Sequence, residues 1–184
     1  DGSVVTFLFD HFEIEDHSRN RKVFFDTYSV SLDERLHSFR EAGKGRALPG
    51  VTKLLKELDS SHRHLALGLL TGNTEEGARI KLRHFQLEEH FEFGAFGDDH
   101  HDRNRLGPIA LERAMSATGH CFSPESVVII GDTPADMTCG KGIGARAIGV
   151  ATGPFNVAEL EAAGGFAVFE DLSMTDMVLT AIFA

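Results

Sequence analysis

The sequence predicts an α/β fold in which helices alternate with the strands of a parallel sheet. Short apolar runs, at residues 65–70 and 127–130, are separated by longer stretches whose apolar residues recur at helical spacing. Neither run alternates polar and apolar residues, which is typical of strands covered on both faces of a parallel sheet. We therefore expect parallel strands joined by right-handed crossovers.

Apolar periodicity, capping residues and breaks at glycine or proline place the elements along the chain. The first helix has Asp1 and Ser3 as candidate caps, and the fourth opens near Thr74. The other helices and strands are placed by the same three signals. Helices are expected at residues 3–12, 18–42, 50–59, 74–86, 107–118, 134–142, 156–163 and 173–182. Strands are expected at residues 64–70, near Phe93, and at 126–131, 146–151 and 166–169.

The strand at 126–131 runs into a turn that presents two carboxylates, Asp132 and Asp136. Ligands of parallel sheets collect beyond the carboxyl ends of the strands, so Asp132 is expected at an active-site edge. Asp136, one helical turn later, is expected to face the same opening. Carboxylates suit Mg²⁺, which prefers a few of them together with waters and phosphate oxygens. An ordinary strand followed by an Asp N-cap explains this motif equally well.

A second strand, at 64–70, ends in Thr71, Gly72 and Asn73 before the helix that opens near Thr74. A threonine hydroxyl and free N–H groups at a helix N-terminus bind anions, and Gly72 lets the backbone approach one closely. Phosphate is the expected occupant. Alone, this segment is more typical of a capped turn. Its occurrence together with the Asp132 motif favours a phosphate site.

The loop at residues 98–107 contains two candidate cations, Arg103 and Arg105. Positioned arginines stabilise the charge of a phosphoryl group through bidentate contacts. Without the two strand-end motifs, a solvated loop charge would be the preferred interpretation of either arginine.

This order of motifs resembles the haloacid dehalogenase superfamily of phosphohydrolases, in particular its small phosphoglycolate phosphatase-like members. The family's second motif is a strand ending in Ser or Thr, which matches Thr71. Its fourth motif is a strand ending in Gly-Asp with another Asp four residues on, which matches Asp132 and Asp136. The third motif supplies Lys or Arg, and Arg103 is the closer match, with Arg105 as the competitor. Residues 48–51, 93–98 and 150–153 also look like this subgroup.

The family's first motif, an apolar strand followed by Asp-x-Asp-x-Thr, has no match in this chain. Its first Asp is the nucleophile. The segment ending at Asp10 fails, because the second carboxylate would fall at Phe12. Asp1 is an alternative as the tail of the motif, but residues 3–12 have largely helical spacing and resemble a helix of the family's cap. We therefore expect a chain truncated at its N-terminus.

The resemblance implies a three-layer, Rossmann-like parallel sheet with a partial helical cap and without its central first strand. The cap would comprise residues 1–46 and the core residues 47–184. Because the absent strand would pair between the strands that carry Thr71 and Asp132, two sheet edges are expected to be exposed. Exposed edges favour aggregation or self-association.

For the parent protein, the resemblance implies a Mg²⁺-dependent phosphohydrolase that acts on a small phosphorylated metabolite through an aspartyl-phosphate. Asp132 would hold Mg²⁺, and Asp136 would support the metal through water or as a neighbour of its ligands. Thr71, Gly72, Asn73 and Arg103 would bind the phosphoryl group. This chain alone is expected to be inactive, since it lacks the nucleophile. The alternatives are a metal-independent 2-haloacid dehalogenase and a non-catalytic relative that binds phosphate or a protein.

The composition of the chain limits the classes of binding partner that can be expected. The chain has 184 residues, 42% hydrophobic content and a formal net charge of -10. These values suit one domain with a full core and a small appendage, and they argue against nucleic acid or an anionic membrane surface as partners. No apolar run reaches the length of a membrane span and no secretory signal is visible, so a cytoplasmic location is the expectation.

Overall fold

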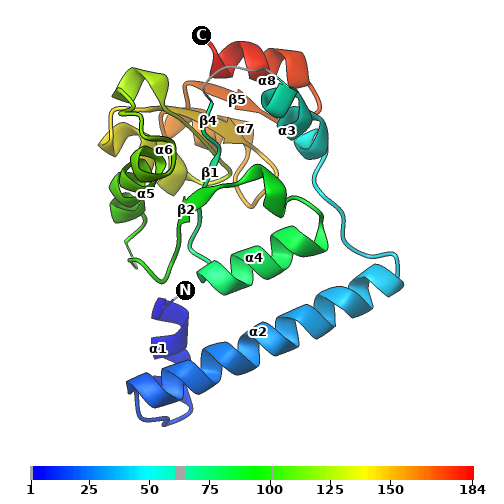
Figure 1. Ribbon diagram of the computed structural model, residues 1–184, viewed down its shortest axis with the longest axis vertical. Helices are drawn as coiled ribbons and strands as arrows, with labels where there is room; N and C mark the ends of the chain where they lie inside the picture. Colours follow the sequence, from blue (N-terminus) through cyan, green and yellow to red (C-terminus); the bar gives the residue numbers. More distant parts are fainter. Residues whose placement is uncertain (1, 61–64, 101) are drawn as a thin grey trace.

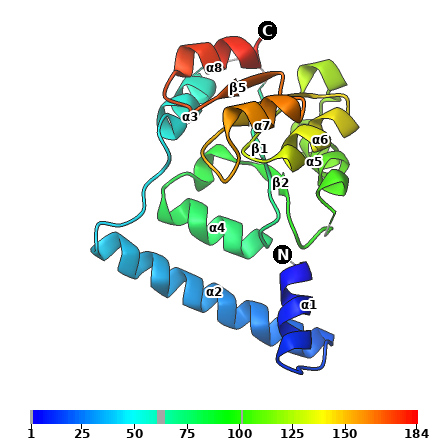
Figure 2. The same ribbon diagram turned by 180° about the vertical axis from the view of Figure 1, so that it is seen from behind.

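The structure is a computed structural model that describes residues 2–60, 65–100 and 102–184. Its strands form two parallel sheets (Figures 1 and 2). Strand β1 (Gly68–Leu70) pairs with β2 (Phe93–Ala95), and the second sheet has the order β3-β4-β5. The strands of the second sheet are β3 (Val128–Gly131), β4 (Arg146–Val150) and β5 (Ala167–Phe169). The α/β fold with parallel strands is therefore confirmed.

Strand β4 shows why the core has three layers, since its successive side chains point to opposite faces. Ile148 is fully buried in a cluster with Leu54 of α3 (Val51–Ser60) and Val178 of α8 (Thr175–Ile182). The next residue, Gly149, faces the other side: a methyl group there would lie 3.1 Å from Leu160 Cβ of α7 (Val157–Ala162). Helix α6 (Pro134–Gly142) covers this second face beside α7.

The two sheets face each other across an apolar groove of about 330 Å³. One wall is the β1 segment from Leu65 onward and the other is β3, with α5 (Arg103–Thr118) along the side. Three large apolar side chains in its lining are exposed: Leu65, Ile130 and Phe183. In the described part of the chain no strand lies between β1 and β3.

The first two helices, α1 (Gly2–His11) and α2 (Ser18–Glu41), are set apart from the sheets (Figure 1). They pack on each other through Phe9 and Phe24, whose rings are arranged edge to face with their centroids 5.8 Å apart. Helix α2 runs alongside α4 (Glu75–His84), where Tyr28 lies against Gly77. The division into a cap at 1–46 and a core at 47–184 stays a prediction. Asp1 lies outside the described residues.

Two element boundaries differ from the expectation by more than two residues. Helix α5 begins at Arg103, not at residue 107, because Asp102 caps it by accepting a hydrogen bond from the Asn104 backbone N–H. Pro108 therefore lies inside the helix. Strand β1 is limited to three residues, since β2 offers only three partners. Residue 64 of the expected strand is outside the described part of the chain.

The remaining elements are two short 3₁₀ helices, η1 (Glu88–His90) and η2 (Pro124–Ser126). Within residues 2–60, 65–100 and 102–184, no helix is both long enough and apolar enough to cross a lipid bilayer.

Candidate active site

Thr71 directly follows β1, and its backbone N–H donates to the Ala95 carbonyl of β2 at 3.0 Å. Its hydroxyl oxygen accepts two hydrogen bonds from Asn73, one from the backbone N–H at 3.1 Å and one from Nδ2 at 2.9 Å. At Gly72, a methyl group would meet no atom within 4 Å. The turn therefore has open space beside Gly72, where a ligand has room.

The N-terminus of α4 is less available to an anion than the sequence suggests. Asp98 places a carboxylate oxygen 2.7 Å from the Glu75 backbone N–H, so a protein side chain already uses this donor. The Thr74 hydroxyl likewise accepts from the Gly77 N–H at 3.1 Å. Two N–H groups of the first turn of α4 are consequently already bonded to protein side chains.

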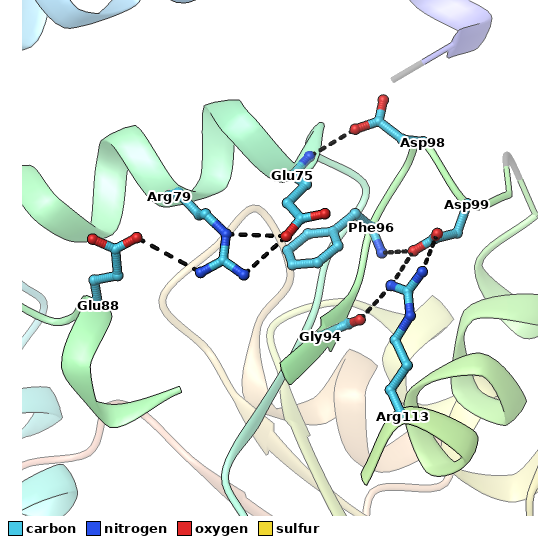
Figure 3. A network of polar contacts seen from close by, with 8 residues as sticks. All are labelled: Glu75, Arg79, Glu88, Gly94, Phe96, Asp98, Asp99 and Arg113. Atoms are coloured by element: carbon cyan, nitrogen blue, oxygen red, sulfur yellow. Dashed lines mark hydrogen bonds and ion pairs between the residues drawn. The ribbon is translucent and has the colours of Figure 1, made fainter. Parts of the chain in front are cut away.

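A network of polar contacts fixes the turn that follows β2 (Figure 3). Asp99 forms a bidentate pair with Arg113 of α5, with N–O distances of 2.6 and 2.7 Å. Arg113 also donates to the Gly94 carbonyl at 2.6 Å, and the Phe96 N–H donates to Asp99 at 2.8 Å. The Arg113 guanidinium, more than the Phe96 N–H, lowers the pKa of Asp99 below its ordinary value. Through Asp98, this turn holds α4 in place.

Arg103 is the first residue of α5, and its side chain contacts the end of β1 and the start of α6. One of its terminal nitrogens is 2.5 Å from Asp136 Oδ1 and 3.5 Å from the Leu70 carbonyl, the last residue of β1. Its Nε is buried and has no hydrogen-bond partner among the described residues. Arg105 is exposed instead. Of the two candidate arginines, the structure brings Arg103 to the strand ends.

Asp136 does not face the opening, contrary to the expectation, and only 1% of its surface is exposed. It is the third residue of α6 and turns back to the helix start. There it accepts hydrogen bonds from the Thr133 N–H at 3.0 Å and the Thr133 hydroxyl at 2.8 Å. With Arg103 as its third partner, the carboxylate is held as a fixed counter-charge to the arginine.

Asp132 is the open carboxylate of the pair. It follows β3, is half-buried, and forms no hydrogen bond or ion pair with the described residues. A methyl group on Gly153 would lie 2.4 Å from its Oδ2, so glycine is required for this close approach. An unpaired carboxylate at a strand end fits a hard cation that keeps most of its waters. In the described part of the chain, no group of three His, Cys, Asp or Glu residues is placed to hold a metal. Asp132 therefore offers one ligand.

Lys81 is a polar residue near the site that the sequence analysis does not single out. Its ammonium donates to Asn73 Oδ1 at 2.7 Å. One signal in the sequence points to it: Lys81 lies four residues after Gly77 and three after Ala78, on the buried face of α4. A lysine on such a face is unusual.

Comparisons with known proteins show the family and the fold. The sequence profile of the haloacid dehalogenase-like hydrolases matches residues 6–150. No curated protein matches the chain. Among solved structures, a HAD phosphatase from Thermococcus onnurineus is similar with a TM-score of 0.66 and 18% identity, over 96% of this chain and 70% of that one. A predicted phosphoglycolate phosphatase from Haemophilus somnus is similar with a TM-score of 0.66 and 16% identity, over 95% of this chain and 73% of that one. A hydrolase from Pseudomonas syringae is similar with a TM-score of 0.65 and 22% identity, over 91% of this chain and 74% of that one.

The structural similarities are below 25% identity and therefore support the fold alone. The sequence profile covers more than half of the chain, including the segments that carry Thr71, Arg103, Asp132 and Asp136. The chain belongs to the haloacid dehalogenase-like hydrolases.

Proposed function

We propose that this chain provides the phosphate- and metal-binding part of a Mg²⁺-dependent phosphohydrolase for a small phosphorylated metabolite. The observation that carries the proposal is the position of Arg103. Its guanidinium reaches the last carbonyl of β1, beside Thr71, and also Asp136 at the start of α6, just after Asp132. A hydroxyl, a cation and an open carboxylate thus gather at the carboxyl ends of β1 and β3, where parallel sheets bind ligands.

Each of these residues has a role that its contacts support. Thr71 donates its hydroxyl proton to a phosphoryl oxygen, and Arg103, whose side chain is 31% exposed, compensates the phosphoryl charge. Asp136 fixes the position of Arg103. Asp132 would hold Mg²⁺, which when bound neutralises charge on the transferring group. Asp136 would support that metal only indirectly, because its own oxygens are already bonded.

The aspartyl-phosphate chemistry needs a further carboxylate that attacks phosphorus, expels the alcohol and is then released by water. The groove between β1 and β3 lies beside the strand ends and holds no strand among the described residues. We therefore expect the 184-residue chain to bind phosphate together with Mg²⁺ but not to turn over phosphomonoesters.

The proposal is tested by titrating the 184-residue chain with inorganic phosphate, with and without Mg²⁺, while following backbone amide resonances by NMR. We expect the Thr71–Asn73 resonances to shift and Mg²⁺ to strengthen binding. Asp132→Asn should abolish the Mg²⁺ effect, whereas Asp33→Asn, at an exposed position of α2, should not change it. Absence of phosphate binding would contradict the site, and hydrolysis of p-nitrophenyl phosphate by the chain would contradict its expected inactivity.

A second candidate function is phosphate binding without catalysis. The Thr71 turn and Arg103 favour it, because a hydroxyl donor and a positioned guanidinium can bind phosphate without a nucleophile. The protein isolated from its source at its native mass distinguishes the two. Mg²⁺-dependent hydrolysis supports the enzyme, and phosphate binding without turnover supports the binding protein.

A further inference from the structure

Lys81 has an unusual environment for a lysine. Its side chain is half-buried against the Thr71–Asn73 turn, and burial lowers the pKa of its ammonium group. In the described part of the chain no carboxylate pairs with it, and its recorded partner is Asn73 Oδ1, at 2.7 Å. Partly burying a charge is unfavourable unless the charge is paired. The position of Lys81 therefore calls for a role within the turn.

The first consequence concerns the orientation of the Asn73 amide. An ammonium group only donates hydrogen bonds, so the atom that faces Lys81 must be the amide oxygen. The amide nitrogen is then turned toward Thr71, and it donates to the Thr71 hydroxyl oxygen at 2.9 Å. Lys81 thus selects one of the two possible amide orientations.

The second consequence concerns the Thr71 hydroxyl. A hydroxyl has two acceptor positions and one proton. Asn73 occupies both acceptor positions, through its backbone N–H and its Nδ2. The proton has no acceptor among residues 2–60, 65–100 and 102–184, and the space beside Gly72 is open. The Thr71 hydroxyl is consequently left with a proton that it can donate to a bound ligand.

We propose that Lys81 is a positioning residue that acts through Asn73 to fix the Thr71 hydroxyl as a hydrogen-bond donor to a phosphoryl oxygen. The inference rests on the proposed function and deepens it, since it specifies the chemistry that the turn accepts. A fully deprotonated oxyanion has only acceptors and matches this hydroxyl. A ligand group that itself must donate a proton to Thr71 finds both lone pairs occupied.

The test is a double-mutant cycle on the full 184-residue chain, with inorganic phosphate and Mg²⁺ as the probe. Lys81→Met keeps the length and apolar stem of the side chain and removes its charge. We expect it to weaken phosphate binding by about 3- to 10-fold, as loss of one well-placed hydrogen bond does. Thr71→Val should weaken binding by a similar factor. Because both changes remove the same hydrogen bond, the double variant should bind no more weakly than Thr71→Val alone.

Two further readouts separate positioning from other roles. Lys81→Met should unfold in urea at the same or a higher concentration, because it removes a partly buried charge, whereas a merely structural lysine would lower the midpoint. The Asn73 side-chain NH₂ resonances should exchange slowly with water in the unchanged chain and faster in Lys81→Met, with or without phosphate.

Several results would overturn the inference. One is an equal weakening by Lys81→Met in the unchanged chain and in the Thr71→Val variant, which would make Lys81 a general positive charge. Another is unchanged phosphate affinity in Lys81→Met. If the unchanged chain fails to bind phosphate, the proposed function fails. The Asn73 resonances then still decide: loss of protection in Lys81→Met supports the positioning of Asn73, and unchanged protection overturns it.

Discussion

Arg103 and Asp136 show how a single ion pair connects distant parts of this molecule. Asp136 is buried at the start of α6, whereas Arg103 starts α5 and reaches the end of β1. Removing one partner of such a pair leaves the other charge without compensation. The pair therefore contributes to stability as well as to the proposed phosphate site.

At the residue scale we predict that Asp136→Asn lowers the free energy of unfolding by about 1–3 kcal/mol. The figure is below that of a fully buried pair, because Arg103 keeps 31% of its side chain exposed. Urea unfolding measures the change. Asp33→Asn, with an exposed carboxylate in α2, is the matched control and should stay within about 0.5 kcal/mol. Equal stability of both variants would show that the pair is dispensable.

At the scale of elements, the turn after β2 is the point where β2, α4 and α5 are joined. Asp98 accepts a hydrogen bond from the Glu75 backbone N–H at the start of α4, and the neighbouring Asp99 pairs with Arg113 of α5 (Figure 3). Because the Thr71 turn precedes α4 directly, the geometry of the candidate site depends on these two carboxylates. Because these contacts depend on ionised carboxylates, the packing of β2, α4 and α5 is sensitive to acid.

We predict that Asp99 contributes to the loss of stability at low pH. Its pKa is lowered in the folded state, first by Arg113, so the pair stabilises the fold above the ordinary aspartate pKa. That contribution is lost as the pH falls through the folded-state pKa, from about pH 4 downward. Asp99→Asn should therefore flatten the acid limb of the stability curve, measured by urea unfolding at several pH values. Asp26→Asn, which removes an exposed pair with Lys22, should leave that limb unchanged.

At the scale of the whole molecule, the groove between the two sheets is the feature that most favours association with another chain. The facing edges of β1 and β3 are unpaired in the described structure, and the groove exposes Leu65, Ile130 and Phe183. Unpaired backbone groups next to apolar side chains favour pairing with another chain.

We predict that the 184-residue chain self-associates through this groove. Ile130 is 38% exposed at the edge of β3, so Ile130→Lys places a charge there without filling a buried site. Light scattering after size-exclusion chromatography should show oligomers for the unchanged chain and a larger monomer fraction for Ile130→Lys. Met177→Lys, at an exposed position of α8, should behave like the unchanged chain. A monodisperse monomer of the unchanged chain would contradict the prediction.

The order of helices and strands and the strand-end positions of Thr71 and Asp132 follow from the sequence, because apolar periodicity and turn chemistry are local properties. The start of α5 was predicted four residues too late. The cap that Asp102 provides starts the helix ahead of Pro108, which consequently lies inside it.

The α/β fold and the strand-end positions of Thr71 and Asp132 can be predicted from the sequence, since each depends on short stretches of chain. Which charged groups lie in contact depends on the tertiary structure. It turned Asp136 away from the opening toward Arg103, placed Asp98 on α4, and set Lys81 against Asn73. These pairings depend on how α4, α5 and α6 pack around the ends of the strands, and the spacing of residues along the chain does not encode that packing.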